Sequence, residues 1–283
     1  MKKIGIIFFV LVICIITLFN NFDEMKLTPL TTGEEFLGNQ PYIMIGDVVL
    51  TQPSSTIIVY MLGIFIILLG IRFLREKEKH ISKKWWGISM IFWGIGAIFA
   101  GTSYQAFGYQ LKCVGREYCN FTDWWEIIYL LLTAISIGML VVAMSHCIAK
   151  GKTRKAMKMI AYTSVPLYAL VLTIGSVASI QFLVTYELFS IFFMSHFLVF
   201  FILSIKEYKA KGDVMNKRFI IAWIMFLIVN VSYYIYYWLE LSEMLYNSTG
   251  IWFNQNDVLH VLLLFWFIYI WFALPNTIKD IDE

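Results

Sequence analysis

Eight apolar runs of about 20 residues each dominate this sequence and leave it few ways to fold. A helix of that length, rising about 1.5 Å per residue, crosses the roughly 30 Å hydrocarbon core of a bilayer. Charged residues make up only 14% of the chain, against about 25% in a soluble domain. The sequence therefore predicts an all-α polytopic membrane protein with eight transmembrane helices. The expected spans cover residues 4–19, 56–74, 86–106, 124–147, 157–177, 180–205, 219–241 and 253–274.

These runs divide the chain into an N-terminal transmembrane anchor at 1–19, an outer loop at 20–55 and a seven-helix membrane bundle at 56–283. The first run follows Lys2 and Lys3, which is also the layout of a signal peptide. The segment after it, ITLFNNFDE, lacks a small-residue cleavage site, and this favours an uncleaved anchor. The other loops are short, so no separate soluble catalytic domain fits and any chemistry belongs to the bundle.

The basic residues predict the orientation of the chain. Of the 22 Lys and Arg residues, all but Lys26, Lys112 and Arg116 fall on the side that also holds both chain ends. Cytoplasmic loops are enriched in Lys and Arg, so we expect a multi-pass protein of the cell membrane with both termini in the cytoplasm. The net charge of +3 is too small to indicate a nucleic-acid partner. The expected partner is membrane lipid, and the oligomeric state stays open.

Two further residue types fit this topology. Cys113 and Cys119 share one outer loop, on the side of the membrane where disulfides form, so we expect them to be bonded and to pin that loop. Several tryptophans fall at the ends of the expected spans, where indole rings occupy the headgroup region. They are Trp85, Trp86, Trp124, Trp125, Trp238 and Trp252.

Polar residues inside the apolar runs are the candidates for function, because an ionisable group is costly to bury in lipid. They concentrate in the outer half of the expected bundle. Asp257 and His260 are three residues apart and share one helical face. They are compatible with a metal-ligand pair, with a general base oriented by a carboxylate, or with a structural hydrogen bond, and the spacing does not choose among these.

Other candidates come from neighbouring spans at a similar depth. Ser103 ends the third run and Glu126 begins the fourth. Gly94, Ala97 and Gly101 form a small-residue stripe that permits close helix packing, which places the third run centrally. The expected pocket also includes Tyr104, Glu187, Asn230, Tyr234 and Asn256.

Three segments resemble the CREST superfamily of seven-helix membrane proteins, which holds alkaline ceramidases and hemolysin-III/adiponectin-receptor-like proteins. They are AGTSYQAFGYQL, DWWEIIYLLL and FNQNDVLHVLLLFW, and the last is similar to bacterial relatives with an N-D-x-x-H motif on the final helix. The resemblance implies a seven-helix bundle after the anchor. It also implies zinc-dependent hydrolysis of a lipid amide, with a Ser and a His on the second core helix, an Asp on the third and two His on the last.

Carried over to this chain, the resemblance matches Ser103 to the serine, Glu126 loosely to the aspartate and His260 to the second histidine of the last helix. Asn256 and Phe107 stand where the family has its other two histidines. A catalytic zinc takes three protein ligands, so the one remaining imidazole would need two carboxylates. The candidate catalytic residues are thus Ser103, Asp257 and His260, and the candidate zinc ligands are His260, Asp257 and Glu126.

Three functions are compatible with this pattern. The first is a metal-dependent hydrolase of a lipid or amide in the outer half of the membrane. The second is a non-catalytic receptor or lipid-binding protein of the same fold. The third is a small-solute or proton transporter that uses Glu187 and His260 as relays.

Overall fold

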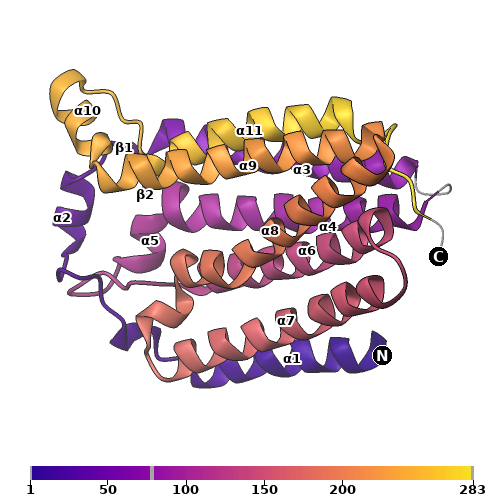
Figure 1. Ribbon diagram of the computed structural model, residues 1–283. Coiled ribbons are helices and arrows are strands. Elements are labelled where there is room, and N and C mark those ends of the chain that lie inside the picture. The colour runs from indigo at the N-terminus through magenta and orange to yellow at the C-terminus, as the bar shows by residue number, and fades with distance from the viewer. Residues whose placement is uncertain (1, 77–79, 282–283) are drawn as a thin grey trace.

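The computed structural model describes residues 2–76 and 80–281, with side chains from Ile7 onward. Within that part of the chain, seven helices are long and apolar enough to cross a membrane, and they lie side by side in one bundle (Figure 1). The all-α class predicted from sequence is confirmed, and seven helices of this length and apolarity are consistent with the predicted multi-pass character. The helices are α3 (Pro53–Arg75), α4 (Ile81–Gly101), α6 (Trp124–Ile148), α7 (Gly151–Val177), α8 (Tyr186–Lys211), α9 (Val214–Trp238) and α11 (Gln255–Ala273).

The first predicted span forms α1 (Lys2–Phe19), which is not one of those seven. Its described apolar part, Ile7–Phe19, is shorter than the others. Val12 and Ile16 are buried, and α1 packs lengthwise along α7 (Figure 1). Leu18 and Phe19 remain exposed. The helix thus presents one apolar face to the bundle and another to its surroundings.

The other helices extend beyond the predicted apolar runs at several ends. Helix α7 starts at Gly151 rather than at residue 157, and α9 starts at Val214 rather than at residue 219. Asp213 caps α9 by accepting a hydrogen bond from the backbone N–H of Asn216 at 2.8 Å. Polar first turns carry no apolar signal, so an apolar run marks only the membrane-crossing part of a helix.

Helices α3 and α4 approach each other closely through glycines. A Cβ atom on Gly94 would lie 2.5 Å from the backbone oxygen of Gly63, and one on Gly70 would lie 2.7 Å from that of Gly87. Such distances leave no room for a side chain. A Cβ on Gly101 would likewise meet Val59 at 2.4 Å. The close packing expected of the small-residue stripe on the third span is therefore present, and α3 is its main partner.

The centre of the bundle is aromatic. Trp86 is fully buried and stacks on Phe73 and on Phe219, with ring centroids 5.6 Å and 6.2 Å apart. The prediction that Trp86 belongs to an interfacial belt is therefore wrong. The position of Trp86 near the end of an apolar run did not show that its side of the helix faces the interior of the bundle.

The predicted outer loop is a folded cap. It contains η1 (Phe22–Glu24), α2 (Gly33–Gly38) and a hairpin of β1 (Tyr42–Ile45) and β2 (Val48–Thr51). Its backbone pairs with the loop after α5 (Gly108–Lys112), where the predicted disulfide Cys113–Cys119 is formed. The N–H of Leu27 donates to Cys119 O at 3.0 Å, and that of Phe121 donates to Met25 O at 2.7 Å.

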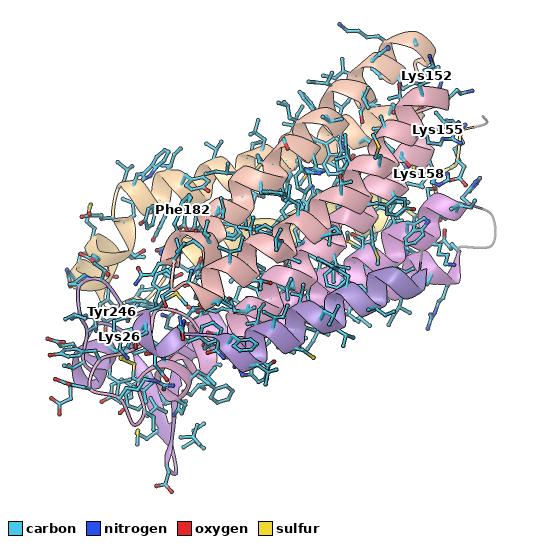
Figure 2. All side chains as sticks on the ribbon, turned by 90° about the horizontal axis from the view of Figure 1, so that it is seen from below. Lys26, Lys152, Lys155, Lys158, Phe182 and Tyr246 are labelled. Carbon is cyan, nitrogen blue, oxygen red and sulfur yellow. A yellow bond between two sulfur atoms is a disulfide. The ribbon has the colours of Figure 1, made fainter. Side chains whose placement is uncertain are left out.

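The two ends of the bundle differ in charge. Both chain ends lie at the same end of the bundle as the connection between α6 and α7 (Figure 1). We name this end the inner end and the opposite end, which carries the folded cap, the outer end; the names refer to the bundle alone. That connection and the first turns of α7 carry Lys152, Lys155 and Lys158, whereas Lys26 lies at the opposite end (Figure 2). Lys77, Lys79 and the side chains of Lys2 and Lys3, which also entered the prediction of orientation, lie outside the described residues.

Candidate functional site

A single π-helical turn, η3 (Thr102–Ala106), extends α4 at its outer end. The N–H of Phe107 donates to Thr102 O at 2.8 Å, which closes the wider turn. Ser103 and Gln105 are 1% and 2% exposed. π-turns of this kind recur at functional sites because they re-aim side chains along a helix. Here the turn buries two polar side chains at the depth predicted for the site.

Ser103 lies between two carboxylates. Its Oγ is 2.5 Å from Asp123 Oδ2 and 3.0 Å from Glu126 Oε1. Because a hydroxyl has one hydrogen, Ser103 donates to one carboxylate at a time. The predicted approach of Ser103 and Glu126 is therefore present, with Asp123 added.

Asp123 was not predicted, although its role is readable in the sequence. It is the N-cap of α6, and its Oδ1 accepts from the backbone N–H groups of Trp125 at 2.7 Å and Glu126 at 3.2 Å. An Asp immediately before an apolar helix is a typical N-cap. The other carboxylate oxygen then remains free to accept from Ser103.

Lys112 pairs with one of these two carboxylates. Its ammonium forms an ion pair with Glu126 and donates to Phe121 O at 3.2 Å. It also lies 5.0 Å from the centroid of the Tyr104 ring. Lys112, Asp123 and Glu126 are all buried. Glu126 is thus committed to a salt bridge inside the protein. We call Ser103, Lys112, Asp123 and Glu126 the Ser103 cluster.

Asp257 has a different role from the one expected. It forms a capping box at the start of α11, with Oδ2 accepting from the N–H of Asn254 at 2.9 Å and from Ser55 Oγ at 2.8 Å. Among the described residues, no hydrogen bond joins Asp257 to His260. The hydrogen-bonded pair considered from the spacing is therefore not formed. Asp257 is held by the helix end and ties α11 to α3.

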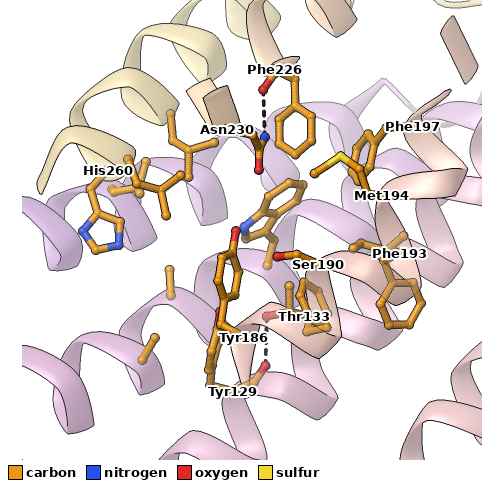
Figure 3. Close-up of a pocket in the computed structure, with 18 residues that line it drawn as sticks. Tyr129, Thr133, Tyr186, Ser190, Phe193, Met194, Phe197, Phe226, Asn230 and His260 are labelled. Atoms are coloured by element: carbon orange, nitrogen blue, oxygen red, sulfur yellow. Dashed lines mark hydrogen bonds between the residues drawn. The ribbon is translucent and has the colours of Figure 1, made fainter. Parts of the chain in front are cut away.

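His260 borders two cavities. Its Nδ1 is buried and has no hydrogen-bond partner in the described part of the chain. The side chain lines two adjoining cavities, an outer one of about 390 Å³ and an inner one of about 90 Å³ (Figure 3). Residues that line both are Ala100, Tyr129, Tyr186, Leu259 and His260.

The two cavities differ in chemistry. The outer cavity is lined by polar groups that include Gln105, Lys112 and Glu126. The inner cavity continues into an aromatic end that includes Phe193, Phe197, Phe226 and Trp93. Together they form a space with a polar mouth and an apolar end.

The predicted pocket residues fall into three groups. Tyr104, Glu187 and Asn256 line the outer cavity. Asn230 lines the inner cavity, where its Nδ2 donates to Phe226 O of its own helix at 2.8 Å. Tyr234 lines neither cavity; its ring meets Tyr233 edge to face and lies against Trp238. Ser103 and Asp257 lie behind the cavity walls.

The residues do not fit a zinc ion. Within the described residues, no group of three or more His, Cys, Asp or Glu side chains is placed to hold a metal. The proposed ligands His260, Asp257 and Glu126 are therefore not brought together as one set. Glu126 pairs with Lys112, and Asp257 caps α11. Phe107 and Asn256, which the resemblance to the CREST superfamily matches to two histidines, supply no imidazole. Zinc binding stays a prediction, and the described residues offer no set of ligands for the ion.

The sequence profile of one family covers residues 54–279, from the first turn of α3 to the segment after α11. The chain belongs to DUF6962, a family of unknown function. The DUF6962 match spans the seven long apolar helices from the second residue of α3 onward, and it includes every residue that lines the two cavities except Leu27. No curated protein and no solved structure matches the chain.

Proposed function

We propose that this DUF6962 protein is an integral membrane protein that binds an amphipathic small molecule in its outer half, without a metal ion. The observation that carries the proposal is the joined pair of cavities at His260. A polar mouth followed by an aromatic end suits a molecule with one polar head and one apolar chain. This is the lipid-binding function among the three considered above.

The other two functions have less support. A metal-dependent hydrolase needs a ligand set, and the candidate residues are committed elsewhere. A transporter needs a path to the inner side, yet Phe193, Phe197 and Phe226 line the deep end of the inner cavity. The resemblance to CREST proteins is compatible with this proposal. Ser103 lies beside two carboxylates, which supports a metal-free relative of that fold.

Photolabelling tests the proposal. A dodecan-1-ol probe with a diazirine at the chain end should label peptides that contain Phe193 or Phe226, saturably and in competition with unlabelled dodecan-1-ol. Leu259 lines both cavities, so Leu259→Trp should abolish this labelling by filling the space. Leu170→Trp, on an exposed face of α7, is the matched control. Labelling confined to exposed positions such as Leu170 and Leu198 would rule the proposal out.

We further propose that α1 is an eighth membrane span and that both termini are cytoplasmic. The basic residues gathered at the terminal end of the bundle support this orientation (Figure 2). In a Cys14→Ser/Cys147→Ser background, an Asp47→Cys variant should react with an impermeant maleimide added to intact cells. A Lys152→Cys variant should react only after lysis. The reverse pattern would invert the topology.

A further inference from the structure

We propose that the outer cavity recognises an ammonium group, so that the bound molecule is a cationic amphiphile whose amine head lies at the mouth and whose chain enters the inner cavity. The inference rests on the proposed binding function and specifies its ligand. Four observations carry it: the charge balance of the lining, an unpartnered buried acceptor, the surrounding tyrosine rings and the apolar end.

The charged residues of the lining leave an excess of negative charge. They are Lys112, Glu126 and Glu187. The ammonium of Lys112 is already paired with Glu126 and bonded to Phe121 O. Glu187, at the exposed rim, has no ion pair or hydrogen bond of its side chain with any described residue. An anionic head would therefore meet an unpaired carboxylate without a free cation, whereas a cationic head would neutralise it.

Gln105 points to the kind of cation. Its side chain is 2% exposed and lines the outer cavity, and its Oε1 has no hydrogen-bond partner among the described residues. A buried carboxamide oxygen without a donor is costly. A primary ammonium brings three N–H donors, so it can serve both Gln105 and a carboxylate. A quaternary ammonium carries the charge but has no donor for Gln105.

Aromatic rings surround the same space. Five tyrosines line the outer cavity: Tyr104, Tyr129, Tyr186, Tyr233 and Tyr237. Aromatic faces attract cations, and Lys112 over the Tyr104 ring already shows such a contact within this lining. Rings also pack well against the first methylenes of an alkyl chain. The head and the start of the chain are thus both accommodated before the aromatic inner cavity begins.

A matched series of ligands separates these contributions. Protein in nanodiscs of zwitterionic lipid would be titrated with octylamine, octyltrimethylammonium, octan-1-ol, octanoate and methylamine, with empty nanodiscs as the blank. Octylamine should bind at least about tenfold more tightly than octan-1-ol, since a hydrogen-bonded charge is involved. Octanoate should be weakest of the octyl compounds. Methylamine should bind far more weakly than octylamine, because it has no chain for the inner cavity.

Variants test which residues recognise the ammonium group. Gln105→Met should weaken octylamine about tenfold and leave octyltrimethylammonium unchanged, whereas Glu187→Gln should weaken both. The controls are Gln110→Met, a half-buried glutamine whose amide atoms are buried and which lines neither cavity, and Glu243→Gln in α10 (Leu241–Thr249), a carboxylate outside both. Both controls should bind all five compounds as the unchanged protein does.

The outcomes distinguish the two proposals. Equal or tighter binding of octanoate or octan-1-ol would overturn the ammonium inference while supporting an amphiphile site. Methylamine binding as tightly as octylamine would show a site for free amines and would also overturn it. No saturable binding of any octyl compound would overturn the proposed function itself.

Discussion

The two ends of the bundle bury polar groups in different ways. At the inner end, backbone oxygens near the helix ends accept hydrogen bonds from two arginines. Arg218 donates to Ala273 O at 2.5 Å and to Thr277, and Arg154 donates to Ala149 O at 3.0 Å and to Ile281 O at 2.6 Å. At the outer end, buried atoms of Gln105 and His260 beside the cavities have no partner. Among the described residues, unpartnered buried atoms also occur at the inner end, among them Asn216 Oδ1 and Trp86 Nε1, but Gln105 and His260 are residues that line the joined cavities.

The Ser103 cluster contributes to the stability of the outer end. It holds one ammonium and two carboxyl groups away from water. Removing one partner from a buried ion pair leaves an uncompensated charge. Lys112→Met should therefore have the largest effect, a loss of about 3–5 kcal/mol in the free energy of unfolding, measured by equilibrium unfolding in mixed micelles.

Two further variants make this test specific. Lys211→Met breaks an ion pair between Lys211 and Glu207, which lie one helical turn apart and are more exposed than Lys112 and Glu126, and it should cost about 0.3–0.5 kcal/mol. Lys112→Met combined with Glu126→Gln should recover part of the loss, because the buried charge is removed as well. A Lys112→Met protein within about 1 kcal/mol of the unchanged one would refute the pairing argument.

The disulfide gives the next largest effect. Cys113 and Cys119 close a short loop, and such a crosslink contributes about 2 kcal/mol. The double variant Cys113→Ser/Cys119→Ser should lose about that amount. Hydrogen exchange should rise first at Leu27 and Phe121, whose N–H groups join the cap to this loop. Equal loosening at the inner end would contradict the separation of the two ends.

At the inner end, Asp280 offers a smaller and pH-dependent test. It accepts from the backbone N–H groups of Ile81 at 2.7 Å and Ser82 at 3.0 Å, at the start of α4. Burial acts to raise the pKa of Asp280, but hydrogen bonds from Ser82 and Ile81 outweigh it and hold that pKa below its usual value. Asp280→Ala should cost about 1 kcal/mol at neutral pH.

The sign of the pH effect follows from the lowered pKa. The ionised form of Asp280 is favoured by folding, so its contribution is present above the unfolded pKa of about 4 and is lost as the pH falls through the folded pKa. The difference in unfolding free energy between the unchanged protein and Asp280→Ala should shrink below about pH 4. A difference that grows on acidification would exclude this cap.

Sequence reasoning identified the helices of the bundle because apolar length is a strong signal. It also brought Ser103 near Glu126 and paired Cys113 with Cys119, since both depend on topology. It did not resolve rotation about a helix axis. Trp86 is in the core instead of the headgroup region, and the Tyr234 ring contacts Tyr233 and Trp238 outside the cavities.

Sequence reasoning also did not predict hydrogen bonds between segments that are far apart in the chain. Ser55 bonds Asp257 across 202 positions of sequence, and no local pattern indicates that pairing. Asp257 and His260 share a face by spacing, yet the capping position of Asp257 decides its partners. Gln105 was missed because the π-turn that buries it has no simple sequence signature.

The smallest structural effect belongs to His260, and it also tests metal binding. Its Nδ1 has no partner among the described residues, so His260→Ala breaks no known hydrogen bond and should change stability by less than about 1 kcal/mol. With Glu126 held by Lys112 and Asp257 by Ser55, one imidazole alone would face a metal. Elemental analysis should therefore find no stoichiometric zinc in either protein. One zinc per chain that disappears in His260→Ala would show that the outer end rearranges into a metal site, and would return the hydrolase function to first place.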